Sequence, residues 1–339
     1  MPSVVRTSLG YDAANRSVAV LDGSARTRIE AAGPDRAKVL HNLTTNDVKR
    51  LAAGRGVEAF LTSGQGRTLA LLTIHAEADR LLVRADPGSA AAILGHVGKY
   101  GLFDDATFEE ITAGTAEWHA CGPEVGPLAD RLGLTLPAGD LSIAAATIAG
   151  LPVRLIVESP SGRPGLSVIS AAADADAVGA AIRRGVADLG GEALDAEAWE
   201  ALRIEAGTPV FGRDVTAANL PQEIGRDARA ISFVKGCYLG QETVARLDAL
   251  GHVNKILFGA VVEPGRTPPA PGTSIQAEGK DVGVVTSSAE SPGWSRGVVL
   301  GIAKVTHVAP GSTLVAATAD GPVTLVVRRW PMISGAVGP

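Results

Sequence analysis

The chain has 339 residues, 46% of them hydrophobic, and its 31 basic and 36 acidic residues leave a net charge of −5 at pH 7. A globular chain of this length and composition can fill two or three hydrophobic cores, so we expect a multi-domain protein. The acidic balance and the lack of any basic run argue against nucleic acid as a partner and favour small molecules or proteins.

The N-terminal third predicts strands followed by helices. Residues 17–22 and 28–31 alternate weakly and predict short strands, and a helix is expected from Pro34 to about Leu43, since proline is tolerated in a first helical turn. Three further strands and a second helix follow at 58–62, 67–75, 80–85 and 89–100. Gly64 and Gly66 lie in a predicted hairpin, and Leu69 stands where a dinucleotide-binding loop needs a third glycine. We therefore reject a Rossmann dinucleotide-binding fold.

The middle of the chain predicts strands and helices in mixed order. The predicted strands lie within 105–120 and near 143–148, 152–158 and 165–170, and the predicted helices cover 123–132, 172–189 and 194–206. The last helix should end at Gly207, with Pro209 beyond it. Because strands and helices do not alternate regularly, we expect an α+β architecture.

Beyond about Lys255 the chain predicts strands only. The segments 255–262, 273–277, 281–287, 296–303, 312–317 and 323–330 are short, and turns rich in proline and glycine separate them. We therefore expect a C-terminal antiparallel β-barrel over residues 255–332, with the proline-rich segment 263–272 as a loop inside it.

The two cysteines and the apolar segments indicate the cellular compartment in which the protein works. Cys121 and Cys237 allow no disulfide framework and no Cys-x-x-Cys metal knuckle, as is usual in a reducing cytoplasm. The N-terminus lacks a signal-like segment, and the most apolar later stretch is broken by Pro152 and Arg154. We therefore expect a cytoplasmic protein that does not enter a membrane. The six histidines lack metal-ligand spacing, so we expect no stable metal site.

The segment Lys-Gly-Cys-Tyr-Leu-Gly-Gln-Glu at 235–242 is the most unusual stretch of the sequence. A helix is expected over 243–250, and a thiol at or just before its N-terminus is in a position where a helix favours an anion. Lys235 would add a positive charge near Cys237, which predicts a reactive thiolate. The alternative is a buried, inert cysteine beside an ordinary helix end.

This segment resembles the signature of the YgfZ family, which are folate-binding proteins related to the glycine-cleavage T-protein and implicated in iron–sulfur cluster assembly or repair. The segments 43–48 and 202–207, and then Pro209, Phe211-Gly212 and Asp214, fit the same superfamily in the expected order. The resemblance implies an aminomethyltransferase-like folate-binding fold of ferredoxin-like α+β units with the C-terminal barrel. It also implies a first, discontinuous domain of residues 1–50 with about 115–250, and a second of about 51–114.

The resemblance further implies a site for tetrahydrofolate or a one-carbon derivative. Glu205 would accept two hydrogen bonds from the pterin ring, and the alternative is a salt bridge to Arg203, Arg213 or another basic group. Cys237 and Lys235 would act chemically. The other residues expected at the cofactor are Asn46, Asp47, Arg226, Tyr238, Gln241 and Glu242.

Two functions remain open, and a third is weaker. The first is a monomeric tetrahydrofolate-binding accessory protein for iron–sulfur cluster assembly or repair, with iron–sulfur client or assembly proteins as partners. In it Cys237 would serve as nucleophile, transient ligand or redox group.

The second function is a folate-dependent aminomethyl- or methyltransferase. Aminomethyltransferases carry adjacent acids where this chain has Ala70 and Leu71, which leaves Asp47, Glu205 or Asp214 for proton transfer. The third is an interaction module that has lost its ligand.

Overall fold

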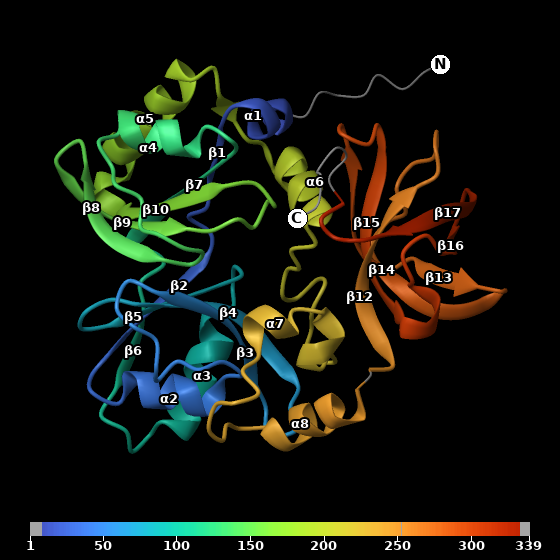
Figure 1. The fold of residues 1–339 in the computed structure, drawn as a ribbon, viewed down its shortest axis with the longest axis horizontal. Helices are drawn as coiled ribbons and strands as arrows, with labels where there is room; N and C mark the ends of the chain where they lie inside the picture. The colour runs from blue at the N-terminus through green and yellow to red at the C-terminus, as the bar shows by residue number, and fades with distance from the viewer. Residues whose placement is uncertain (1–8, 252, 333–339) are drawn as a thin grey trace.

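The strands of this chain form three separate sheets, which Figure 1 shows side by side. The computed structural model describes residues 9–251 and 253–332. Two sheets are open and have helices packed against them, and the third closes into a barrel. The α+β architecture and the C-terminal antiparallel barrel predicted from the sequence are therefore confirmed.

The five-stranded sheet lies at the lower left of Figure 1. Its strand order is β3-β4-β5-β2-β6, and every neighbouring pair is antiparallel. We expected residues 1–50 to lie with 115–250, but β2 pairs with β5 and β6 of this sheet. The strands are β2 (Thr27–Ala32), β3 (Gly56–Thr62), β4 (Thr68–Ala76), β5 (Leu81–Ala85) and β6 (Thr107–Glu110).

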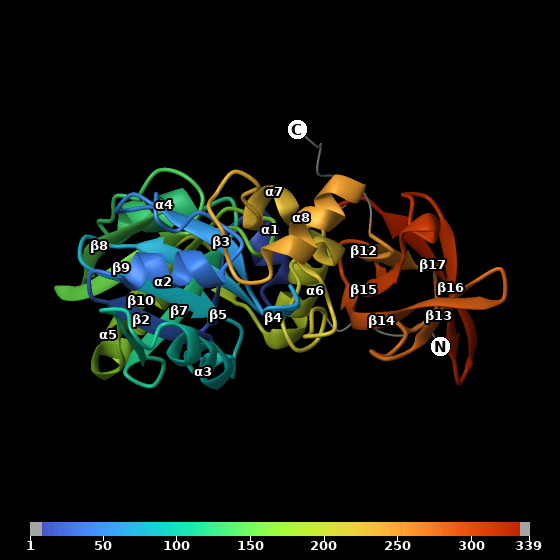
Figure 2. The same cartoon turned by 90° about the horizontal axis from the view of Figure 1, so that it is seen from below.

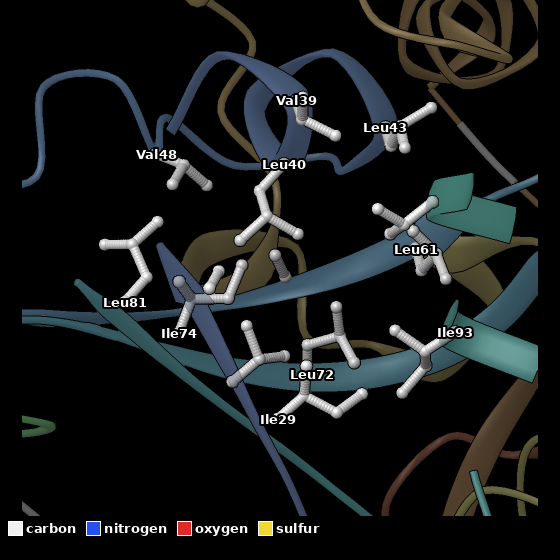
Figure 3. Close-up of a cluster of buried hydrophobic side chains, with 14 of the residues drawn as sticks. Ile29, Val39, Leu40, Leu43, Val48, Leu61, Leu72, Ile74, Leu81 and Ile93 are labelled. Atoms are coloured by element: carbon white, nitrogen blue, oxygen red, sulfur yellow. The ribbon is translucent and has the colours of Figure 1, made fainter. Parts of the chain in front are cut away.

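Helices α2 (Arg36–Leu43) and α3 (Ala90–Tyr100) cover one face of the five-stranded sheet. Val39, Leu40 and Leu43 of α2 are buried in the core of this sheet, and because residues three and four positions apart share one face of a helix, this face lies toward the strands. Figure 3 shows Leu40 of α2 above Leu72 of β4, with Ile29 of β2 below Leu72. This shared core explains why β2 and α2 belong with β3 to β6 rather than with the later residues.

The six-stranded sheet has the order β11-β1-β7-β10-β9-β8. β1 pairs with β11 in parallel, and the other neighbouring pairs are antiparallel. Leu128 of α4 and Ile182 of α5 pack in a core on one face of the sheet. The elements of this half are α1 (Tyr11–Arg16), β1 (Ala19–Asp22), β7 (Thr115–Cys121), α4 (Val125–Arg131), β8 (Ile143–Ile148), β9 (Leu151–Val157), β10 (Gly165–Ala171), η1 (Ala172–Asp174), α5 (Ala175–Asp188) and β11 (Glu192–Ala193).

Helix α6 (Ala196–Ala206) connects the open sheets to the barrel, because it packs against α1 and against strand β14 of the barrel. Asp195 caps its N-terminus by accepting a hydrogen bond from the amide of Ala198. Gly207 ends it with a φ of 74°, as predicted. The next helical segments are η2 (Pro221–Ile224), α7 (Asp227–Ala230) and α8 (Gln241–Leu250).

The barrel closes in the order β12-β15-β14-β13-β16-β17. Viewed from below (Figure 2), it lies at one end of the molecule, with α6 and α8 between it and the open sheets. None of the helices in the described part of the chain is long and apolar enough to cross a membrane. The barrel segment consists of β12 (Lys255–Val262), β13 (Ser274–Ala277), β14 (Lys280–Ser291), β15 (Arg296–Lys304), η3 (Val305–His307), β16 (Thr313–Thr318) and β17 (Gly321–Arg328).

Candidate functional site

A cavity of about 260 Å³ lies where the two open sheets meet the C-terminal end of α6. β3, β4 and the ends of β5 and β9 form its walls, and apolar residues such as Leu71 and Leu141 separate its polar groups. A concave site with a few convergent polar groups among apolar ones is the usual form of a small-molecule site. The charged residues that line it are Arg26, Glu58, Asp86, Glu158, Arg226 and Arg229.

Glu58 on β3 lines one wall of the cavity and forms ion pairs with two arginines. Arg226 donates to both carboxylate oxygens through Nε and Nη2, and the Nη2–Oε2 distance is 2.5 Å. Arg229 approaches the same carboxylate at 3.5 Å but is half exposed. Because Glu58 itself is only 4% exposed, Arg226 supplies most of the compensation that its buried charge requires.

Asp86 follows β5 directly and faces the cavity beside Leu71 of β4. Leu72 pairs with Ala85 in the antiparallel ladder, so one further step of the register brings Leu71 opposite Asp86. The amide of Phe211 donates to Asp86 Oδ2 at 2.6 Å. Burial raises the pKa of Asp86, against the opposing effects of this hydrogen bond and of the Arg26 and Arg203 guanidiniums.

Glu158 follows β9, and hydrogen bonds from a polar network between the two sheets fix its carboxylate. Arg84 Nη2 donates to Glu158 Oε1 at 2.7 Å, and Ser167 Oγ donates to the same oxygen at 2.5 Å. Although burial would raise the pKa of Glu158, the Arg84 and Arg26 guanidiniums hold it well below its usual range. Glu158 is therefore a fixed negative charge at the cavity.

The cavity also has one polar atom without a partner. Thr73 lies on β4 opposite Glu58 of β3, and its buried Oγ1 forms no hydrogen bond within the described residues. A buried hydroxyl without a partner is costly, so a ligand or water that reaches it gains free energy.

Glu205, expected at the pterin, lies outside the cavity lining in a closed network. Its carboxylate accepts hydrogen bonds from Tyr11 and Ser291, both at 2.6 Å, and from Arg163 Nη2 at 3.0 Å. The side chain is 1% exposed. Burial and the nearby Glu205 raise the pKa of Tyr11 to about 12, so the phenol stays a donor. The salt bridge that we weighed as the alternative is present, with Arg163 as the partner.

Cys237 is exposed, as a reactive thiol requires, but it does not lie at the end of α8. The helix begins after Gly240, which has a φ of 84°, so three residues separate its first turn from the thiol. Lys235 does not extend into solvent beside Cys237, because its ammonium donates to the carbonyls of His41 and Thr44 at the end of α2. The charge that we expected Lys235 to hold beside the thiol is instead bound to the end of α2, and the contribution of the helix end to the thiol stays a prediction.

Most of the remaining predicted residues connect loops to neighbouring elements. Asn46 donates to the carbonyls of Glu58 and Arg229, and so joins its turn to β3 and α7. The carboxylate of Asp47 accepts a hydrogen bond from the amide of Arg50. The ring of Tyr238 packs against the Lys235 ammonium, and the side chain of Gln241 accepts a hydrogen bond from the amide of Tyr238. Glu242 lies exposed in the first turn of α8.

Of the predicted cofactor residues, the structure brings only Arg226 into the cavity. The sequence reasoning missed Arg26, Glu58, Asp86 and Glu158. Asp86 and Glu158 each directly follow a strand that already contains an arginine, so their sequence positions do not mark them as site residues. Among residues 9–251 and 253–332 no group of three or more His, Cys, Asp or Glu side chains could hold a metal ion.

Comparisons with known proteins agree with this architecture. The GCVT N-terminal domain matches residues 9–235, and the glycine cleavage T-protein C-terminal barrel domain matches residues 255–333. An Arabidopsis thaliana protein named "Putative transferase At1g60990, chloroplastic" is 29% identical over 95% of this chain and 73% of its own length. The aminomethyltransferase of Streptomyces avermitilis is 26% identical over 86% of this chain and 80% of its own.

A solved structure supports the same fold. The aminomethyltransferase T of the Bartonella henselae glycine cleavage system superposes with a TM-score of 0.85, at 18% identity, over 96% of this chain and 88% of its own. The aminomethyltransferase-like fold implied by the sequence resemblance is therefore confirmed.

Proposed function

We propose that this chain, which belongs to the glycine cleavage T-protein family, binds tetrahydrofolate or a one-carbon derivative and acts as a folate-dependent aminomethyl- or methyltransferase. Tetrahydrofolate is the one-carbon carrier of the aminomethyltransferases in this family. The names of the relatives favour a transferase over the accessory role that we put first from the sequence. The binding site in this proposal is the cavity between the two open sheets.

The residues of the cavity suit a pterin ring. Its N–H and amino groups need carboxylate acceptors, and Glu158 is an ionised carboxylate at the cavity. The ring faces need apolar walls, which Leu71 and Leu141 provide. Arg229 is half exposed, where it could meet the carboxylates of a folate tail outside the cavity. The unpaired hydroxyl of Thr73 gives the ligand one more polar contact.

The transferase proposal depends mainly on Asp86. One-carbon transfer at a folate nitrogen needs a positioned acid or base, and Leu71 stands where aminomethyltransferases have an acid. Asp86 lines the same wall across the strand pair, and burial raises its pKa. In our proposal Asp86 therefore holds the proton that is exchanged with the reacting nitrogen. Asp47, Glu205 and Asp214, our earlier candidates, are absent from the cavity lining.

Two measurements on the same variants test this proposal. Calorimetric titration with tetrahydrofolate and its 5-methyl and 5,10-methylene derivatives measures binding, and a single-turnover assay of one-carbon release from the loaded protein measures transfer. We expect Asp86→Asn to bind folate nearly as well as the wild type but to lose transfer. Absence of folate binding by the wild-type chain would overturn the proposal altogether.

A second candidate function is the accessory role of the YgfZ family in iron–sulfur cluster assembly or repair. It is favoured by the 235–242 motif, by the exposed Cys237 outside the cavity lining, and by Ala70 and Leu71 in place of the family acids. In this proposal a cytoplasmic monomer binds folate and meets iron–sulfur client or assembly proteins. Cys237→Ser should then keep folate binding and lose the support of cluster-dependent enzymes in cells. Unchanged support by Cys237→Ser would argue against this role.

A further inference from the structure

Glu158 has one carboxylate oxygen that the protein uses and one that it leaves free. Oε1 accepts hydrogen bonds from Arg84 Nη2 at 2.7 Å, Ser167 Oγ at 2.5 Å and Arg26 Nη1 at 3.4 Å. Oε2 accepts none in the part of the chain that the structure describes, and unlike the buried hydroxyl of Thr73 it keeps some contact with solvent. Because the bonds to Oε1 fix the carboxylate, Oε2 is a positioned acceptor for a donor group of a ligand.

Arg26 lies beside this carboxylate with most of its donors free. Its side chain is 28% exposed and lines the cavity, and the contact with Glu158 is the one hydrogen bond that its guanidinium forms among the described residues. A guanidinium has five N–H donors in a planar fork and no acceptor. Arg226, by contrast, binds both oxygens of Glu58, and Arg229 binds Asp140 at 2.7 Å. Arg26 is therefore the cavity arginine with donors available to a ligand.

We propose that Arg26 and Glu158 together recognise a lactam, an N–H group beside a carbonyl, on a ring bound in the cavity. Glu158 Oε2 accepts a hydrogen bond from the lactam N–H, and Arg26 donates one to the carbonyl oxygen next to it. This inference rests on the proposed folate function, in which the lactam is the N3–H and 4-oxo edge of the pterin ring. Arg26 is then a specificity residue that selects 4-oxo over 4-amino pteridines.

The chemistry of the two side chains explains why a 4-amino ring fits poorly. Such a ring carries a donor at position 4 and an unprotonated nitrogen at position 3. It would set its amino group against the donors of Arg26 and its ring lone pair against the carboxylate of Glu158. Both hydrogen bonds are then lost, and a site built to bond one group rejects an analogue that leaves its polar groups unpaired.

The same orientation suits the acid that the transferase proposal requires. Burial raises the pKa of Asp86 and the Arg26 guanidinium opposes this increase, so the two side chains act on each other across the cavity wall. In a pterin, N5 and the 4-oxo oxygen lie on the same side of the ring, and N8 lies on the other. A pterin held by Arg26 at its 4-oxo oxygen therefore has N5, rather than N8, on the side of Arg26 and Asp86.

Two ligands that differ at position 4 test the inference. Tetrahydrofolate and its 4-amino analogue tetrahydroaminopterin are titrated calorimetrically into the full chain in the absence of oxygen. The readout is the ratio of the two dissociation constants. We expect the wild type to prefer tetrahydrofolate by about 10- to 100-fold, which is the range for the loss of a hydrogen bond to a charged group. A ratio near one in the wild type would overturn the inference.

The variant is Arg26→Gln, with Arg80→Gln as the matched control. A glutamine amide can donate to an oxo group or accept from an amino group, so we expect the ratio in Arg26→Gln to fall below about 3-fold. Arg80 also pairs with a glutamate, Glu30, but lies outside the cavity lining, so Arg80→Gln should keep the wild-type ratio. If Arg26→Gln fails to fold, Arg26→Met takes its place and should also lose the preference.

A wild-type ratio in a folded Arg26 variant would overturn the inference, because a purely structural arginine would change both affinities together and leave their ratio unchanged. The experiment also separates this inference from the function on which it rests. Equal binding of the two ligands by the wild type would reject only the role of Arg26 and Glu158. Binding of neither ligand would reject the folate function as well.

Discussion

Leu71 of β4 and Asp86, which directly follows β5, line the same cavity one position beyond Leu72 and Ala85, where the two strands pair. Side chains opposite each other on one face of a sheet lie close enough to exchange roles. In our proposal Asp86, next to the end of β5, supplies the acid that the sequence resemblance led us to expect at positions 70 and 71 of β4. This relationship is why the loss of the acids at positions 70 and 71 does not by itself exclude transfer chemistry.

The first prediction concerns Asp86→Asn. We expect folate affinity to change little and transfer to fall by about 100-fold, which is typical of the loss of a general acid or base. Adding Leu71→Asp to this variant should recover part of the activity, since it returns a carboxyl group to the same wall. Single-turnover assays of the single and double variants give the result, and full activity of Asp86→Asn would remove Asp86 from the mechanism.

The same substitution has a predictable effect on stability. Burial raises the pKa of Asp86, so the folded chain binds its proton more tightly than the unfolded chain does. The free energy of unfolding therefore falls as the pH rises from the unfolded pKa through the folded one. Asp86→Asn cannot ionise, and we expect it to be as stable as the wild type or more stable at pH 7. Urea unfolding curves at pH 4 and pH 7 test the sign.

The second prediction compares two arginines at one carboxylate. Arg226 binds Glu58 through two nitrogens and is mostly buried, whereas Arg229 is 49% exposed. Removal of one partner from a buried ion pair costs about 3 kcal/mol or more, and removal from an exposed pair costs about 1 kcal/mol or less. Urea unfolding should therefore find Arg226→Ala much less stable than Arg229→Ala. Equal losses would mean that water compensates Glu58.

The positions of the strands and helices could be predicted because each leaves a local pattern. β4 is mostly apolar and follows a predicted hairpin turn, and α6 ends at a glycine with a proline two residues beyond, so the sequence predicts both within a few residues. The partners of a strand leave no such pattern. β1 and β2 are both short, and only the core that β2 shares with α2 decides which sheet it joins.

The candidate site could be predicted only in part for the same reason. The cysteine motif is contiguous, so it could be recognised, but the cavity joins Glu58, Asp86, Glu158 and Arg226 from four separate segments. Glu205 is the opposite case, and its role at the pterin stays a prediction. Its position in a family motif indicated a ligand contact, and the structure gives its carboxylate to Arg163, Tyr11 and Ser291.

The third prediction separates the two interpretations of Glu205. Glu205→Gln leaves the buried Arg163 without a counter-charge, so we expect a loss of about 3 kcal/mol in the free energy of unfolding. Folate affinity, measured by calorimetry, should be unchanged. Glu200→Gln is the control, because Glu200 is more exposed and contacts arginines on the same helix and the following turn. A stable Glu205→Gln protein with weakened folate binding would restore the pterin role.

The fourth prediction uses Lys235, whose ammonium is buried against the end of α2. Burial lowers its pKa to about 7, whereas an unfolded lysine has a pKa near 10.4. Between these values the unfolded chain binds more protons, so the free energy of unfolding should rise with pH by up to about 1.4 kcal/mol per unit. We expect urea unfolding from pH 7 to 10 to show this rise in the wild type and in the control Lys255→Met, an exposed lysine. Lys235→Met should be flatter. A flat wild-type curve would instead mean that the carbonyls of His41 and Thr44 keep the ammonium charged in the folded chain.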